Sequence, residues 1–218
     1  LDMWEVDIAR IDPRAASPTH MKARMGEAVA DLFALHSPFK QPTAGRGLRT
    51  SALHNRWKAA GAVFGLTAGW ERGLWYAHNA TERDLPYSAG TQAWQNISKR
   101  EAATMASGAV LLDLSPFTKI RVSGKGTLAA LDALTTAHID VPVGRAVYTL
   151  FLNDQGGIEI DATITRLGTE EFEITTGAAT RRRDMAYLRR KLPAMLKVTD
   201  QTEAFCVIGL MGVTSREI

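Results

Sequence analysis

The sequence predicts an α+β fold, with a largely antiparallel sheet and flanking helices. The first observation is a hairpin pattern at residues 148–167, where polar turn formers from Asn153 to Gly157 separate two apolar runs. The second is the mixed order of the predicted elements, in which neighbouring strands can pair as hairpins. Such an order favours an antiparallel sheet over a doubly wound parallel one.

The composition is that of an ordinary globular protein of one or two domains, with 218 residues, 45% hydrophobic and 22% charged. The net charge of +3 is too small to indicate a nucleic-acid partner. No apolar run approaches the ~18 residues that span a bilayer, so no membrane partner is expected. The first residues lack the pattern of a signal peptide. Both ends have the appearance of internal sequence, which predicts that the chain is a piece of a longer polypeptide.

Residues 1–90 predict a mostly helical connector. Two stretches have apolar residues at helical spacing, and the first follows a capping residue, Ser17 or Thr19. These helices are expected at residues 21–34 and 51–60.

An aromatic, glycine-rich segment follows at residues 61–87. It shows no periodicity, and we expect its aromatic side chains to pack in a core. Residues 82–90 predict a surface loop and a boundary between two domains, residues 1–90 and residues 91–218.

Helices and strands mix in the second domain. Helices are expected at residues 91–107, 127–137 and 180–191, and strands at residues 118–124, 171–177, 195–200 and 204–212, besides the hairpin. The apolar run at residues 109–114 predicts a buried segment. In the last helix, Met185, Leu188 and Leu192 are expected to point inward.

The second arm of the hairpin alternates strictly between apolar and polar residues. One face carries Ile158, Ile160, Ala162 and Ile164, and the other carries Glu159, Asp161, Thr163 and Thr165. Aspartate is depleted in strands, so Asp161 in mid-strand needs a reason. It can belong to a solvated outer face or to a site, and the pattern alone favours the solvated face.

Several kinds of chemistry find no support. There is no dinucleotide-binding or phosphate-binding glycine motif and no GxSxG elbow. The five histidines are scattered without an i, i+4 pair, and there is one cysteine, so no metal site is expected. That residue, Cys206, lies in an apolar run and is interpreted as an inert core thiol.

A basic cluster at residues 181–191 has two interpretations. The cationic side chains fall on more than one face of the predicted helix, which indicates a solvated surface. Guanidinium groups also bind carboxylates well, so a receptor for an acidic ligand tail is the alternative.

Four stretches carry a family resemblance: LLDLSPFTKIRVSG, VPVGRAVYTLFLNDQGGIEIDATITRL, ITTGAATRRRDMAYLRR and IGLMGVTSREI. Over residues 97–218 they resemble the first part of the folate-binding aminomethyltransferases of the glycine-cleavage T-protein type. Residues 1–90 resemble the segment that joins the flavin domain to the folate domain in dimethylglycine and sarcosine dehydrogenases.

The resemblance implies an enzyme in two parts. A flavin domain, which is absent from this chain and lies upstream in cis or on another chain, uses FAD to oxidise an N-methyl amine. The folate domain then captures the one-carbon unit on tetrahydrofolate as 5,10-methylenetetrahydrofolate. The alternatives are a glycine-cleavage aminomethyltransferase and a non-catalytic folate-binding module. The expected compartment is a bacterial cytoplasm, with the mitochondrial matrix as the alternative.

The resemblance also implies site residues. Asp161 matches the family aspartate that approaches the folate nitrogen and is the expected catalytic residue. Tyr148 and Phe117 match positions beside the ligand. Gly177 stands where glycine-cleavage proteins have an asparagine that contacts the pterin, and this departure favours the dehydrogenase branch.

Overall fold

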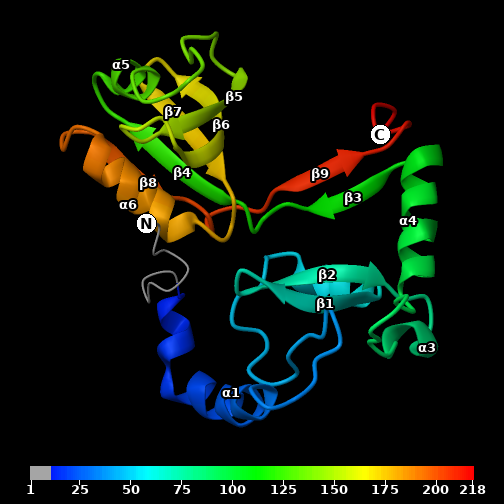
Figure 1. Cartoon of the computed structure of the whole chain (residues 1–218). Helices are drawn as coiled ribbons and strands as arrows, with labels where there is room; N and C mark the ends of the chain where they lie inside the picture. Colours follow the sequence, from blue (N-terminus) through cyan, green and yellow to red (C-terminus); the bar gives the residue numbers. More distant parts are fainter. Residues whose placement is uncertain (1–10) are drawn as a thin grey trace. The chain divides into compact units, whose positions relative to one another are not determined.

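The computed structural model describes residues 11–218. Contacts divide these residues into two units, which are considered separately (Figure 1). One unit comprises residues 115–205, and the other comprises residues 11–114 with residues 206–218. The predicted domain boundary at residue 90 stays a prediction.

The unit of residues 115–205 is built on a five-stranded antiparallel sheet. Its strands are β4 (Thr118–Ser123), β5 (Ala146–Leu152), β6 (Ile158–Gly168), β7 (Glu171–Thr176) and β8 (Lys197–Asp200), in the order β5-β6-β7-β4-β8. Its helices are α5 (Thr127–Asp132) and α6 (Arg181–Lys191). The predicted fold class, α+β with an antiparallel sheet, is confirmed.

The predicted hairpin is β5 and β6, and its turn closes by local hydrogen bonds. Oδ1 of Asn153 accepts from the backbone N–H groups of Gln155 at 3.0 Å and Gly157 at 2.8 Å. Gly156 has a φ of 81°, a left-handed conformation that glycine adopts without steric cost. Asparagine at the start of the turn and glycine at the left-handed position therefore fix where the two strands separate.

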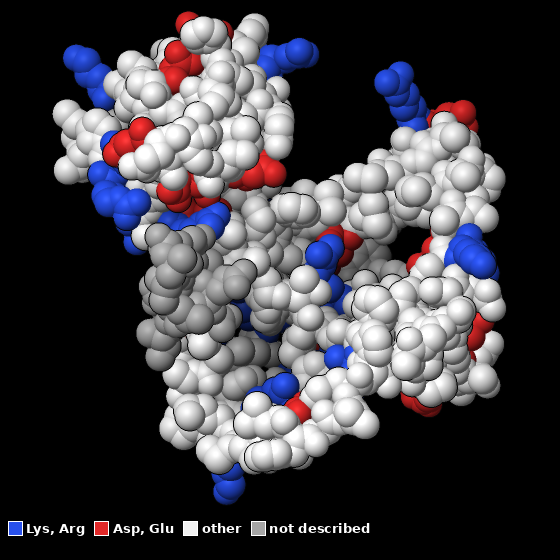
Figure 2. All heavy atoms as spheres, in the orientation of Figure 1, with Lys and Arg blue, Asp and Glu red and all other residues white. Residues whose placement is uncertain are grey.

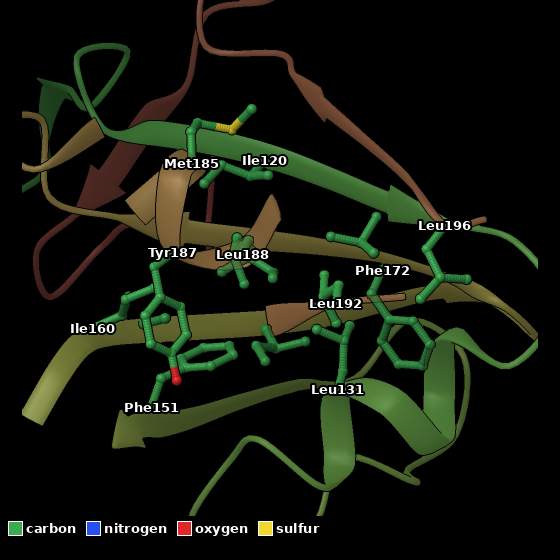
Figure 3. Packing of buried hydrophobic residues seen from close by; sticks show 14 of the residues in the cluster. Ile120, Leu131, Phe151, Ile160, Phe172, Met185, Tyr187, Leu188, Leu192 and Leu196 are labelled. Carbon is green, nitrogen blue, oxygen red and sulfur yellow. The ribbon is translucent and has the colours of Figure 1, made fainter. Parts of the chain in front are cut away.

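One face of this sheet forms the core of the unit. Side chains from four strands pack with side chains from α5 and α6, so both helices cover the same face (Figure 3). The cluster contains Ile120, Val122, Leu131, Ile139, Phe151, Ile160, Ala162, Ile164, Phe172, Ile174, Met185, Tyr187, Leu188, Leu192 and Leu196. The predicted inward face of α6 is confirmed. The opposite face of the sheet, here called the outer face, carries the polar set of β6.

The second unit contains helices and two small antiparallel sheets. Its helical elements are the 3-10 turn η3 (Pro13–Ala16), α1 (Pro18–Asp31), α2 (His54–Ala59), α3 (Ala80–Arg83) and α4 (Gln95–Ser107). One sheet pairs β1 (Ala62–Thr67) with β2 (Trp70–Tyr76), and the other pairs β3 (Val110–Asp113) with β9 (Ile208–Met211).

Polar contacts order the long connection after α1. Glu27 accepts from the backbone N–H groups of Thr43 and Ala44, both at 2.8 Å. These bonds lower the pKa of Glu27 from 4.5 to about 2. Glu71 of β2 holds the guanidinium group of Arg46 and accepts from the N–H of Gly47 at 2.7 Å. Carboxylates on regular elements thus bind the backbone of a segment that has no strand or helix of its own.

The aromatic, glycine-rich segment forms a hairpin, β1 and β2, around a turn at Ala68 and Gly69, which both have positive φ. Trp70 and Trp75 are buried, as expected of the aromatic side chains of this segment. Two other sequence-based expectations were wrong in this unit. The apolar run at residues 109–114 is not buried, since Leu111 of β3 is 50% exposed. Cys206 is exposed and is not a core thiol. A two-stranded sheet covers little apolar surface, which explains the exposure of β3.

The core predicts a large effect of truncation at α6. Leu188 is fully buried, so Leu188→Ala removes apolar contacts and leaves a cavity. We expect unfolding of the unit to become easier by about 2–5 kcal/mol in a denaturant titration. Leu35→Ala makes the same truncation at a fully exposed side chain and is the control. Equal midpoints for the two variants would contradict this account of the core.

Candidate functional site

Strand register brings three of the predicted site residues together at one end of the sheet. Thr118, Thr176 and Ala162 are direct neighbours across β4, β7 and β6, and all three are buried on the helix-covered face. One position further on, Asp161 lies in β6, Gly177 follows the end of β7, and Phe117 precedes the start of β4.

Successive side chains of a strand point to opposite faces, so Asp161 of β6 faces away from the helices. Asp161 and Gly177 are exposed, and Phe117 is 40% exposed. The start of β4 and the residue after β7 stay close together, because Oγ1 of Thr118 donates to the carbonyl of Gly177 at 3.0 Å. The row of Phe117, Gly177 and Asp161 is called the site row below.

Tyr148 lies in the adjacent row of the same face. The register pairs it with Thr163 of β6, which pairs with Thr175 of β7 and, through it, with Lys119 of β4. Tyr148 is therefore diagonal to Asp161, at a separation that an aromatic side chain can bridge. Tyr148 and Asp161 thus share the outer face of the sheet, and Gly177 and Phe117 lie at the adjacent ends of β7 and β4.

The Tyr148 hydroxyl and the Asp161 carboxylate interact. A side-chain hydrogen bond with Asp161, together with the charge of its carboxylate, raises the pKa of the Tyr148 phenol above 10.0. The Tyr148 side chain is 65% exposed, and burial is the smallest of the three causes that raise its pKa, so the carboxylate accounts for most of the effect. The neutral phenol can donate to Asp161 and leaves the other lone pairs of that carboxylate open to a ligand.

Gly177 leaves space in the site row. A Cβ built on it would contact only Oγ1 of Thr180, at 3.8 Å, and its φ lies outside the left-handed region. A residue with a side chain could therefore occupy position 177 without backbone strain and without a steric clash. The site row therefore has an open position at Gly177.

Sequence reasoning missed three polar neighbours of these residues. Thr163 and Thr175 lie between Tyr148 and Lys119 on the outer face, and their hydroxyls can serve as donors or acceptors. Lys119 follows the buried Thr118 in β4, where buried and outward-facing positions alternate. This pattern predicts that the lysine side chain is exposed to water. The structure instead buries it almost completely. No signal in the sequence announces that burial.

The basic cluster of α6 is largely engaged within its own unit. Arg181 contacts Asp200 at 2.5 Å and Glu203 at 3.1 Å, and Lys191 contacts Asp154 at 3.2 Å. The rest of the visible surface also shows basic and acidic side chains interspersed (Figure 2). A solvated helix surface with local ion pairs therefore accounts for this cluster.

Among residues 11–218, no three histidine, cysteine, aspartate or glutamate side chains gather in a way that could hold a metal ion. No helix in the same range is long and apolar enough to cross a membrane.

Comparison with known proteins decides the family. The family model for the GCVT N-terminal domain matches residues 53–218. The chain belongs to this family. The model for the FAD dependent oxidoreductase central domain matches residues 1–51. The order of the two matches confirms the predicted resemblance to flavin-linked members of the T-protein family.

Named relatives agree with this assignment. A 4-methylaminobutanoate oxidase (formaldehyde-forming) from Paenarthrobacter nicotinovorans is 40% identical over 218 residues, which are 100% of this chain and 26% of that protein. Mitochondrial sarcosine dehydrogenase from Mus musculus is 26% identical over 258 residues, covering 100% of this chain and 28% of that protein. The chain thus spans about a quarter of the length of these relatives.

A solved structure shares the fold. Glycine cleavage system aminomethyltransferase T from Bartonella henselae aligns with a TM-score of 0.59 and 23% identity, over 78% of this chain and 42% of that chain. At this identity the likeness concerns the fold, and it agrees with the predicted T-protein-like architecture.

The Tyr148–Asp161 contact predicts a specific titration. The carboxylate accepts from the neutral phenol and repels the phenolate, so both effects favour the protonated tyrosine. Asp161→Asn removes the charge, and we expect the pKa of Tyr148 to fall towards 10.0. Carbon-13 NMR of labelled tyrosine, assigned with Tyr148→Phe, measures it.

The matched control for this titration is Glu159→Gln. It removes a carboxylate from the same face of the same strand, two residues from Asp161, and should leave the pKa of Tyr148 unchanged. The same pKa in the wild type and Asp161→Asn would show that the two side chains do not interact.

Proposed function

We propose that this chain is the tetrahydrofolate-dependent one-carbon capture module of a flavin-dependent N-methyl amine dehydrogenase. The relevant amines are of the dimethylglycine and sarcosine type, and the product is 5,10-methylenetetrahydrofolate. The observation that carries the proposal is the site row, in which Asp161, Gly177 and Phe117 belong to neighbouring segments at one exposed end of the sheet.

Asp161 has the chemistry that the transfer needs. A folate nitrogen that attacks an electrophilic carbon gains positive charge and must lose a proton. The Asp161 carboxylate stabilises that charge and accepts that proton. Tyr148 orients the carboxylate by donating to it, while Phe117 and the space at Gly177 hold the flat ring of the pterin.

The electrophilic carbon comes from a flavin domain, in cis or on another chain, in which FAD supplies the oxidation. The match of residues 1–51 to a FAD dependent oxidoreductase central domain supports this arrangement. In this proposal, residues 1–90 connect that domain to the folate domain, which begins near residue 91. A transfer to folate also prevents the release of the one-carbon unit as formaldehyde.

A glycine-cleavage aminomethyltransferase is the second candidate. The fold shared with the Bartonella henselae enzyme favours it. The match of residues 1–51 favours the flavin-linked enzyme, since that match concerns an oxidoreductase domain. A full-length protein that carries flavin and oxidises N-methyl amines would exclude the second candidate.

Substitution of Asp161 tests the proposal on the full-length protein. Wild type supplied with an N-methyl amine should release less formaldehyde once tetrahydrofolate is added. Asp161→Asn should lower the rate of methylenetetrahydrofolate formation by roughly 100-fold or more, because proton transfer by a placed side chain contributes on that order. Formaldehyde and methylenetetrahydrofolate are measured together in one reaction.

Glu159→Gln is the control, because it makes the same chemical change on the same face of β6 and keeps an oxygen to accept from Asn153. It should transfer the one-carbon unit as the wild type does. Wild-type transfer by Asp161→Asn would dismiss Asp161 as catalytic, and a full-length protein that binds no folate would overturn the proposed function.

A further inference from the structure

Lys119 occupies an unusual position in β4. This strand turns Thr118, Ile120 and Val122 towards the helix-covered face, so Lys119 and Arg121 belong to the outer face. Arg121 is partly exposed and pairs with Glu171 at 2.7 Å. Lys119, two residues away on the same face, is only 1% exposed.

The ammonium group of Lys119 turns back onto its own chain. Nζ donates to the carbonyl of Ser115 at 2.8 Å and to the carbonyl of Phe117 at 3.0 Å. The ring of Phe205 covers it, with its centroid 5.4 Å from Nζ. A buried ammonium group is costly unless hydrogen bonds replace its water, and hydrogen bonds from a charged donor are the strong ones. A lysine whose ammonium group is exposed to water does not need two backbone carbonyl acceptors.

These bonds fix the turn that precedes β4. Both acceptors lie within three residues, and one of them, Phe117, belongs to the site row. The next residues are also held, because Thr118 donates to the carbonyl of Gly177 and the N–H of Lys119 donates to Oγ1 of Thr202 at 3.2 Å. The backbone of Phe117 therefore has a defined direction, although its side chain is partly exposed.

We propose that Lys119 is a positioning residue of the folate site, whose buried ammonium group holds the turn from Ser115 to Phe117 so that the Phe117 ring contacts the ligand. The inference rests on the proposed function, because it concerns the site where folate binds. Lys119 acts through Phe117 and does not touch the reacting atoms.

The test measures folate affinity in the full-length protein, with 5-formyltetrahydrofolate as the probe in calorimetry. Lys119→Met keeps the length of the side chain and removes its donors. We expect the Kd to rise about tenfold, the scale of one lost aromatic contact. Lys119→Gln keeps an N–H donor without the charge and should give an intermediate Kd.

The double variant separates positioning from a general loss of structure. If Lys119 acts through Phe117, the substitution Lys119→Met should change the Kd by less than about twofold in a Phe117→Ala background, because effects through one shared contact are not additive. Arg121→Met is the matched control. It removes a cation from the same face of the same strand, outside the site row, and should leave the Kd unchanged.

The outcomes distinguish the two proposals. If the wild type binds the probe and Lys119→Met binds it equally well, the role of Lys119 is overturned while the proposed function stands. An additive effect in the Phe117→Ala background overturns it too. If Lys119→Met fails to fold, the Kd of Phe117→Ala tests the proposal. An unchanged Kd in Phe117→Ala would show that Phe117 does not contact the ligand, and it would overturn the positioning role of Lys119. A wild type that binds no probe overturns both proposals.

Discussion

The antiparallel register of β4, β7, β6 and β5 is the constraint on which the candidate site depends. One face of these strands must be buried, and apolar residues occur at every second position of β6 and β7 to meet that need. A slip by one residue would turn Ile160, Ala162 and Ile164 towards water and Asp161 into the core. The register is therefore held by burial of the helix-covered face.

Burial of the helix-covered face also determines which residues are neighbours on the outer face. Because the register is fixed, residues that are far apart in the sequence become direct neighbours, as Thr118, Thr176 and Ala162 are. Phe117, Gly177 and Asp161 are each adjacent in the sequence to one of these three residues and are brought together with them. The site residues need not contribute to the core in order to be placed accurately. Substitutions such as Asp161→Asn can thus change the chemistry of the outer face while the fold remains.

Charged groups on this face interact with polar groups of neighbouring segments. Tyr148 interacts with Asp161, and Lys119 donates to two carbonyl groups beside Phe117. Each of these groups is placed by a different strand, β5, β6 or β4. The charged groups therefore have defined partners, which is what a preorganised site requires.

The elements with strong local patterns could be predicted from the sequence. Strict alternation identified β6, and the turn formers from Asn153 to Gly157 identified the hairpin. Helical spacing with Met185 and Leu188 identified the inward face of α6. In each case, local preference and tertiary packing require the same conformation.

Other features depend on contacts that a single sequence does not show. The hairpin of β1 and β2 was missed because aromatic residues and glycines interrupt its alternation. The apolar run of β3 was expected to be buried, but its partner is β9, from the distant end of the chain, in a sheet of two strands. The burial of Lys119 depends on a turn and on the Phe205 ring, neither of which follows from the alternating pattern of β4.

The family resemblance named candidate residues, but the sequence did not show that three of them lie at the same end of one sheet. Asp161 alone was interpreted as part of a solvated surface, and nothing local contradicts that interpretation. Pairing of β6 with β7, and of β7 with β4, is the additional information. It brings a carboxylate, a glycine and an aromatic side chain from three separate segments into the site row.

A crystal structure of the full-length protein with 5-formyltetrahydrofolate tests the central claim most directly, because it shows which face of the sheet binds the ligand. The account predicts that the pterin lies on the outer face, in contact with Phe117, over Gly177, and with a folate nitrogen within hydrogen-bonding distance of Asp161. Folate bound away from this face, with the site row open to solvent, would contradict it.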